Sequence, residues 1–304
     1  MMSSRFSDSQ KGILFALFTA LLWGFLPIIL KVSLTKLTPV AVTWFRFALA
    51  SSVLIIFYFI RRPSSLRIMI RPPVMLIIAS VSLGLNYLGF ITGIHYTTPA
   101  IAEIFIQTGA ILLALSGFIF FREKASLRQV IGIVMVFGGL TVFYRNQIIQ
   151  LSHNIAKYQL GVLLTVAGGI MWAVYAIIQK QLVKKYPPME LNLVLFTIPA
   201  IGFLPFVDFN QFNELTPGMW GILIILGVNT LLAYGSLAFA LKYLEANKVS
   251  IIITLNPVIT FSALAILIAL EVSWVVRENF TYISIFGAAL VVAGAVLTVL
   301  RRSK

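Results

Sequence analysis

The sequence predicts an all-α polytopic membrane protein, with ten transmembrane helices arranged as a 5+5 inverted repeat. Three observations favour this fold class. Of the 304 residues, 60% are hydrophobic and only 11% are charged, and the mean hydropathy is +1.00. The hydrophobic residues form runs that are long enough to cross a bilayer. The second half of the chain also repeats features of the first at a nearly constant offset. A soluble enzyme is excluded, because a soluble fold must cover much of its surface with polar groups.

The apolar runs predict ten spans of about 20 residues each. They cover residues 11–31, 40–60, 73–93, 99–121, 127–144, 160–182, 189–208, 217–240, 247–270 and 281–300. Several spans begin at a proline, whose missing N–H removes no hydrogen bond in the first helical turn. These prolines are Pro39, Pro73, Pro99, Pro188 and Pro217. The connections are short, so the chain has no room for a separate soluble domain.

The lysines and arginines predict that both termini face the cytoplasm. With the N-terminus inside, 17 of the 23 basic residues fall in inner segments, five fall in outer segments, and Arg46 lies within a span. This asymmetry follows the positive-inside rule. The net charge of +14 is therefore interpreted as an orientation signal beside anionic lipid headgroups, and not as a surface for nucleic acid.

An internal repeat divides the chain. Gly12, Trp23, Lys31 and Pro39 recur as Gly161, Trp172, Lys180 and Pro188. We expect a first five-helix repeat over 1–146, a connecting segment over 147–159 and a second five-helix repeat over 160–304. Because each repeat holds an odd number of spans, the second copy is inverted relative to the first. Inverted repeats are typical of secondary transporters, which bind substrate near the midplane between the halves. A duplicated scaffold without transport remains the alternative.

The sequence carries no recognisable catalytic or metal-binding motif. The chain has no cysteine and only two histidines, both in predicted outer connections. The patterns H-E-x-x-H, G-x-S-x-G and G-x-x-x-x-G-K-[ST] do not occur. We therefore expect a protein that is not an enzyme and that needs neither a cofactor nor a metal ion.

Charged residues inside spans are the first candidates for a substrate site, because they are expensive to bury in a bilayer. Arg46 and Glu103 fall at similar depths in the second and fourth spans, and they would either form an ion pair or flank a cavity. Gln107 follows Glu103 on the same helical face. The alternatives are that Arg46 bonds backbone carbonyls and that Glu103 lies at the membrane interface.

Amides and aromatic residues near mid-span extend the candidate site. Asn86, Asn229 and Asn256 would either bind a substrate or join helices by hydrogen bonds. Each of two helices has a predicted break or hinge, at Gly109 in the first half and at Pro257 in the second. Three aromatic residues at mid-span would line a cavity or pack in the core. They are Trp23, Trp172 and Tyr175.

These features resemble the drug/metabolite transporter superfamily, in its ten-helix EamA branch. The resemblance is carried by Ala20-Leu21-Leu22-Trp23-Gly24, by the Pro39 helix with Arg46, by Phe121-Arg122-Glu123-Lys124, and by their repetition at Trp172 and Glu271. The two halves also differ, since Leu195 stands where the first half has Arg46, and Gly109 stands where Pro257 would predict a proline.

The resemblance implies a multi-pass protein of the bacterial inner membrane that exports small metabolites such as amino acids by alternating access. In that fold, spans one to four and six to nine surround a cavity, while spans five and ten pack at the side and are available for a homodimer. The expected partners are a small-molecule solute and membrane lipid. A lipid-moving protein and a non-transporting structural subunit of the membrane remain the alternative functions.

Overall fold

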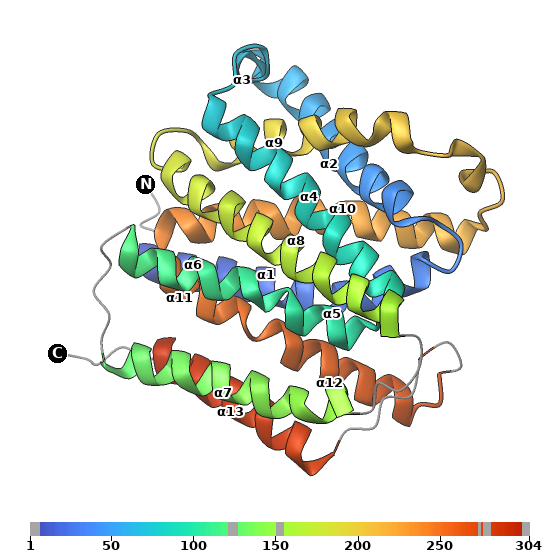
Figure 1. Ribbon diagram of the computed structural model, residues 1–304. Coiled ribbons are helices and arrows are strands. Elements are labelled where there is room, and N and C mark those ends of the chain that lie inside the picture. The colour runs from blue at the N-terminus through green and yellow to red at the C-terminus, as the bar shows by residue number, and fades with distance from the viewer. Residues whose placement is uncertain (1–6, 121–126, 150–154, 273–274, 276–280, 300–304) are drawn as a thin grey trace.

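The computed structural model describes residues 7–120, 127–149, 155–272, 275 and 281–299, and every regular element in these ranges is a helix. Figure 1 shows the helices packed side by side, with the C-terminal helix beside a helix from the middle of the chain. The first half contains α1 (Asp8–Ser33), α2 (Pro39–Arg61), η1 (Pro63–Leu66), α3 (Arg67–Ile70), α4 (Val74–Tyr96), α5 (Pro99–Phe105), α6 (Gln107–Ile119) and α7 (Leu127–Ile149). The second half contains α8 (Ile155–Leu182), α9 (Pro188–Phe203), η2 (Leu204–Phe206), η3 (Phe209–Phe212), α10 (Pro217–Tyr243), α11 (Ala246–Ile253), α12 (Asn256–Ala269) and α13 (Tyr282–Val299).

The all-helical membrane fold is confirmed. Within the described residues, eight helical segments are long and apolar enough to cross a bilayer, and they coincide with predicted spans one to four and six to nine. Helices α7 and α13 occupy the positions of predicted spans five and ten. The count of ten spans and the cytoplasmic position of both termini stay predictions.

The prolines that predicted helix starts lie at the observed starts, and a capping threonine precedes three of them. Helices α2, α5, α9 and α10 begin at a proline, and Pro73 caps α4. Thr38, Thr98 and Thr216 precede three of these helices, and each hydroxyl accepts a hydrogen bond from a backbone N–H in the first turn. Such caps satisfy donors that have no partner inside the helix. The short boundary between spans three and four, at Thr97 and Thr98, is therefore a true helix end.

The two halves pack in reciprocal pairs. Helix α1 of the first half lies against α10, and its counterpart α8 lies against α4, while α2 packs against α9 and α7 against α13 (Figure 1). Each pair contains one helix from each half, and exchanging the halves reproduces the same set of pairs. The arrangement is that of two inverted repeats related by a pseudo-two-fold axis.

Two lysines at equivalent positions make equivalent contacts. Lys31 on α1 donates to the carbonyl oxygens of Ile94 and Thr97 at the end of α4, at 2.9 and 3.0 Å. Lys180 on α8 donates to the carbonyl oxygens of Leu241 and Leu244 at the end of α10. In both halves, a cation from the first helix thus caps the negative end of the third.

The glycines of α7 and α13 let these two helices approach each other within one chain. A Cβ at Gly294 would lie 2.6 Å from the carbonyl oxygen of Gly132, whereas a Cβ at Gly138 would meet nothing within 4 Å. A homodimer through these two helices stays a prediction. Of the two glutamates in the family resemblance, Glu123 falls outside the described residues, and Glu271 lies two residues beyond the end of α12 with a φ of 54°.

Candidate functional site

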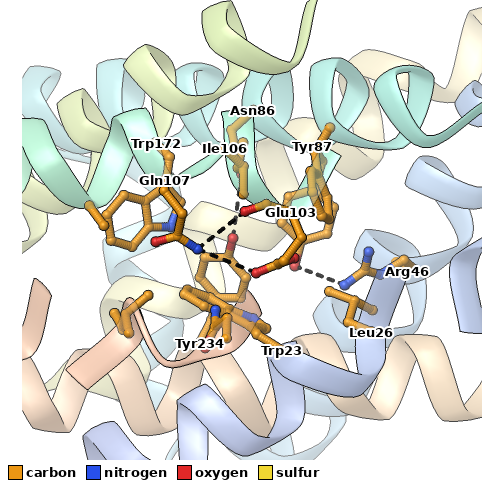
Figure 2. A pocket seen from close by; sticks show the side chains of 14 residues that line it. Trp23, Leu26, Arg46, Asn86, Tyr87, Glu103, Ile106, Gln107, Trp172 and Tyr234 are labelled. Carbon is orange, nitrogen blue, oxygen red and sulfur yellow. Dashed lines mark hydrogen bonds between the residues drawn. The ribbon is translucent and has the colours of Figure 1, made fainter. Parts of the chain in front are cut away.

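A cavity lies between the two halves, where both broken helices meet α1, α4, α8 and α10 (Figure 2). Nearly all of its lining side chains are buried. They are Trp23, Leu26, Arg46, Asn86, Tyr87, Phe90, Glu103, Ile106, Gln107, Ala110, Trp172, Tyr234, Ile253 and Asn256.

Two pairs of equivalent aromatic residues meet in this cavity. Trp23 and Trp172 recur in the repeat, and their ring centroids lie 5.9 Å apart at an interplanar angle of 75°. Tyr87 and Tyr234 lie at matching distances from the ends of α4 and α10, and their ring centroids are 5.5 Å apart. Residues that are related by a two-fold axis can touch each other only near that axis. The pseudo-two-fold axis therefore passes through the cavity.

Arg46 reaches the cavity from α2 and is only 1% exposed. Its Nε donates to the hydroxyl of Thr230 at 3.0 Å, and its Nη2 donates to the hydroxyl of Tyr87 at 3.5 Å. The guanidinium carbon also lies 4.4 Å from the centroid of the Tyr87 ring, a cation–π contact. Thus two hydroxyls and an aromatic face orient the cation, and none of these groups carries a negative charge.

Glu103 reaches the cavity from α5 and is 2% exposed. Gln107 Nε2 donates to the Glu103 carboxyl oxygen Oε1 at 3.4 Å and to the Glu103 backbone carbonyl at 3.3 Å. Gln107 Oε1 is buried and has no hydrogen-bond partner. The ion pairs among the described residues are Lys11–Asp8 and Lys248–Glu245, so no ion pair joins Arg46 to Glu103. Of the two predicted arrangements for these residues, flanking a cavity is the one that the geometry supports.

Both helices that carry predicted breaks are interrupted beside the cavity. The first ends at Phe105 and resumes at Gln107, slightly before Gly109. The second ends at Ile253 and resumes at Asn256, immediately before Pro257. A membrane helix tolerates such an interruption where protein surrounds the backbone. The breaks lie at equivalent places in the repeat, and hinge motion at them stays a prediction.

The three asparagines mainly join helices. Asn86 Nδ2 donates to the carbonyl of Gly168 on α8 at 3.0 Å, and Asn229 Nδ2 donates to the carbonyl of Leu22 on α1 at 2.9 Å. In the amide orientation that satisfies both its oxygen and its nitrogen, Asn256 Nδ2 donates to the carbonyls of Ile253 and Ala20. Asn86 and Asn256 also border the cavity, but Asn229 does not. A role in helix packing therefore has direct support for all three.

Seven of the nine predicted binding residues come together around the cavity, and two do not. Asn229 lies outside it, at the contact between α1 and α10. Tyr175 is fully buried behind it, with its ring centroid 5.6 Å from that of Tyr234. The seven are Trp23, Arg46, Asn86, Glu103, Gln107, Trp172 and Asn256. That these residues bind a substrate stays a prediction.

Three residues that supply much of the aromatic wall were not predicted from the sequence: Tyr87, Phe90 and Tyr234. The helix ends reveal that the two tyrosines are equivalent. Tyr96 and Tyr243 are the last residues of α4 and α10, and counting back from these helix ends aligns Tyr87 with Tyr234. The sequence alone favours a different alignment, because Asn86 and Asn229 each follow a leucine–glycine pair, and this alignment is displaced from the structural one by about one helical turn. Among the described residues, no cluster of three metal-ligating side chains forms.

Comparison with known families supplies the identity. The model of the EamA-like transporter family matches residues 10–145 and 159–300. This chain belongs to the EamA-like transporter family. The two matched ranges place one EamA unit in each half of the chain. Membership in the drug/metabolite transporter superfamily, which the sequence motifs predicted, is thereby confirmed.

Several relatives match over nearly the whole chain. A Haemophilus influenzae protein described as an uncharacterized transporter is 33% identical over 289 residues, which cover 94% of each chain. The uncharacterized inner membrane transporter YhbE of Escherichia coli K12 is 30% identical and covers 93% of this chain and 89% of its own. A solved crystal structure with 18% identity has the same fold, with a TM-score of 0.71 over 94% of this chain and 95% of the other.

The EamA-like chain is therefore a membrane transporter, and it is a multi-pass protein of the inner membrane. Its family and relatives are named as transporters and not as enzymes. A transporter of this family acts on a small-molecule solute, and the cavity between the two halves is the candidate site for it.

Proposed function

We propose that this EamA-like protein is a secondary transporter that exports small metabolites such as amino acids by alternating access. The observation that carries the proposal is the buried cavity, which lies on the pseudo-two-fold axis and is bordered by both broken helices. A site at this place is shared by the two halves, so it can open to either side when the halves tilt. A Salmonella typhimurium relative, 26% identical over 96% of this chain, is described as a probable amino-acid metabolite efflux pump.

Contacts between the halves at both ends of α2 also support alternating access. Ser65, in the connection after α2, donates to Glu190 Oε1 at the start of α9, at 2.7 Å. At the opposite end, the backbone N–H of Thr38 before α2 donates to Gln211 Oε1 in η3, at 2.8 Å. Single hydrogen bonds of this kind contribute about 1 kcal/mol each. Either one can break without unfolding the helices.

The test begins with the solutes that cells release. Metabolites in the medium are compared between cells that produce the protein and matched cells that do not, and each enriched solute is then tested in proteoliposomes. We expect saturable uptake, and counterflow when labelled solute is taken up against an internal load of unlabelled solute. Uptake without saturation or counterflow would contradict a carrier, and the absence of uptake for every enriched solute would favour a non-transporting subunit. Movement of labelled lipid between leaflets, without solute counterflow, would instead favour a lipid-moving protein.

A further inference from the structure

The geometry points to a zwitterion as the cargo, with its anionic group bound by Arg46 and its cationic group bound by Glu103. Both charged groups of the ligand would then be bound by side chains of the first half. This inference rests on the proposed transport function. It concerns a feature that the pseudo-symmetry does not explain. The aromatic wall is built from equivalent residues of both halves, whereas the two charged side chains are not duplicated.

The repeat shows what a symmetric pocket would contain. The position equivalent to Arg46 holds Leu195, which is fully buried, and the position equivalent to Glu103 holds Ile251, which is 2% exposed. The cavity thus combines an uncharged, mainly aromatic contribution from the second half with one basic and one acidic side chain from the first. An uncharged solute would not require either group. A cationic or an anionic solute would require only one of them.

Neither of these buried ionisable side chains has a counter-ion. Arg46 is oriented by two hydroxyls and one aromatic ring, and the carboxyl group of Glu103 meets only uncharged side chains, the amides of Gln107, at 3.4 Å, and of Asn256. A buried charge is expensive unless an opposite charge or several hydrogen bonds compensate it. Because no ion pair joins Arg46 and Glu103 to each other, a ligand can compensate both at once.

The surrounding side chains suit the two ends of such a ligand. A carboxylate beside Arg46 would accept hydrogen bonds from the guanidinium, which is the side chain best matched to that geometry. An ammonium beside Glu103 would meet the carboxylate together with the unpartnered acceptor Gln107 Oε1. Figure 2 shows Glu103 and Gln107 pointing into the space between Arg46 and Trp172. The rings of Trp23, Trp172 and Tyr234 would then contact the rest of the molecule.

The first experiment uses the unmodified protein in lipid nanodiscs. Its melting temperature is measured with a mixture of the standard amino acids, with a mixture of the matching decarboxylated amines, and with a mixture of the matching deaminated acids. Since a ligand stabilises the state that binds it, we expect a rise only with the amino acids. L-Phenylalanine, 2-phenylethylamine and 3-phenylpropanoic acid give the same comparison for one side chain. An amine or acid that stabilises as strongly as its parent amino acid overturns the inference, as does a protein that responds to none of the three mixtures.

The second experiment separates recognition of charge from a structural role. For an amino acid identified by the first experiment, Glu103→Gln should weaken binding at least about tenfold and leave binding of the deaminated acid unchanged. Arg46→Lys should weaken binding of the amino acid and leave that of the amine unchanged, because the lysine keeps the charge but loses the paired donors. Glu245→Gln, at an exposed surface position, is the matched control and should change neither. Equal losses for all three ligand classes would assign Glu103 and Arg46 to structure alone.

The outcomes distinguish this inference from the proposed function. A solute that shows saturable counterflow but carries a single charge or no charge leaves the transporter in place and removes the zwitterion site. A protein that transports no solute and binds none of the mixtures contradicts both. Saturable counterflow of an amino acid, together with the selective loss in Glu103→Gln, supports both.

Discussion

Arg46 is a buried cation that depends on uncharged neighbours for its position. The hydroxyl of Thr230, on α10 of the other half, accepts a hydrogen bond from Arg46 Nε at 3.0 Å. The same hydroxyl donates to the carbonyl of Leu226 in its own helix at 3.1 Å. Thr230 is therefore a positioning residue that connects the cation of the first half to the helix framework of the second.

This arrangement predicts a large effect for a small change at Thr230. Thr230→Val removes the acceptor of Arg46 and leaves a buried charged donor without its partner, which costs about 1–3 kcal/mol. We expect a lower melting temperature of the purified protein and a weaker affinity for its solute.

Thr43→Val is the control for that measurement. Thr43 is also fully buried, but its hydroxyl donates only to the carbonyl of Pro39 in its own helix, at 2.7 Å. The control should change the melting temperature much less. An equal effect of the two variants would mean that the hydroxyl of Thr230 does not orient Arg46.

At the scale of elements, the interrupted helix of the first half packs very closely against α8. A Cβ at Gly109 would lie 2.7 Å from the carbonyl oxygen of Gly169 and 2.9 Å from the ring of Trp172. Backbone cannot move aside easily, so this contact requires a glycine. The residue that the sequence marked as a helix-weakening position also sets the distance between α6 and the aromatic wall.

Gly109→Ala should therefore destabilise the protein and displace Trp172. Overpacking of this kind costs about 1–3 kcal/mol. We expect a lower melting temperature and a shifted tryptophan emission maximum. Gly138→Ala, on α7 with open space around it, should leave both measurements unchanged or raise stability slightly. Equal behaviour of the two variants would argue against the close contact at Gly109.

The lysine caps provide a second test at this scale, because one is present in each half. Lys31→Met and Lys180→Met each remove a cation from the C-terminal carbonyls of the third helix in their own half, a contribution of about 1 kcal/mol. We expect each variant to lower the melting temperature by a similar amount, and Lys36→Met, at an exposed position, to leave it unchanged. A loss in only one half would show that the two caps are not equivalent.

At the scale of the whole molecule, the absence of native cysteine gives a direct test of orientation. Lys36→Cys and Ser64→Cys place a single thiol in the exposed connections before α2 and after it. With the N-terminus inside, a membrane-impermeant maleimide should label Lys36→Cys in intact spheroplasts and Ser64→Cys only after permeabilisation. The opposite pattern would invert the predicted topology.

Much of the fold was predictable because the features that indicate it depend only on the order of residues along the chain. Length of apolar runs, proline at helix starts and basic residues between spans depend on position along the chain, and Trp23 and Trp172 followed from the offset of the repeat. The missed positions depend on rotation about a helix axis. Lipid-facing and protein-facing surfaces are both apolar, so periodicity does not tell which side of α4 carries Tyr87, or that Tyr175 and Asn229 do not line the cavity. The alignment of α4 with α10 required the helix ends that the structure provides.

The pseudo-two-fold relation has a consequence for how the inward-facing and outward-facing states are balanced. In two identical inverted halves, either state becomes the other when the halves exchange their conformations, so the two have equal free energy and equal populations. Any preference must then come from the positions at which the halves differ. Two such differences are Arg46, which is equivalent to Leu195, and Glu103, which is equivalent to Ile251, and both charged members line the cavity. The side chains proposed to choose the cargo are thus also placed to set the resting direction of the carrier.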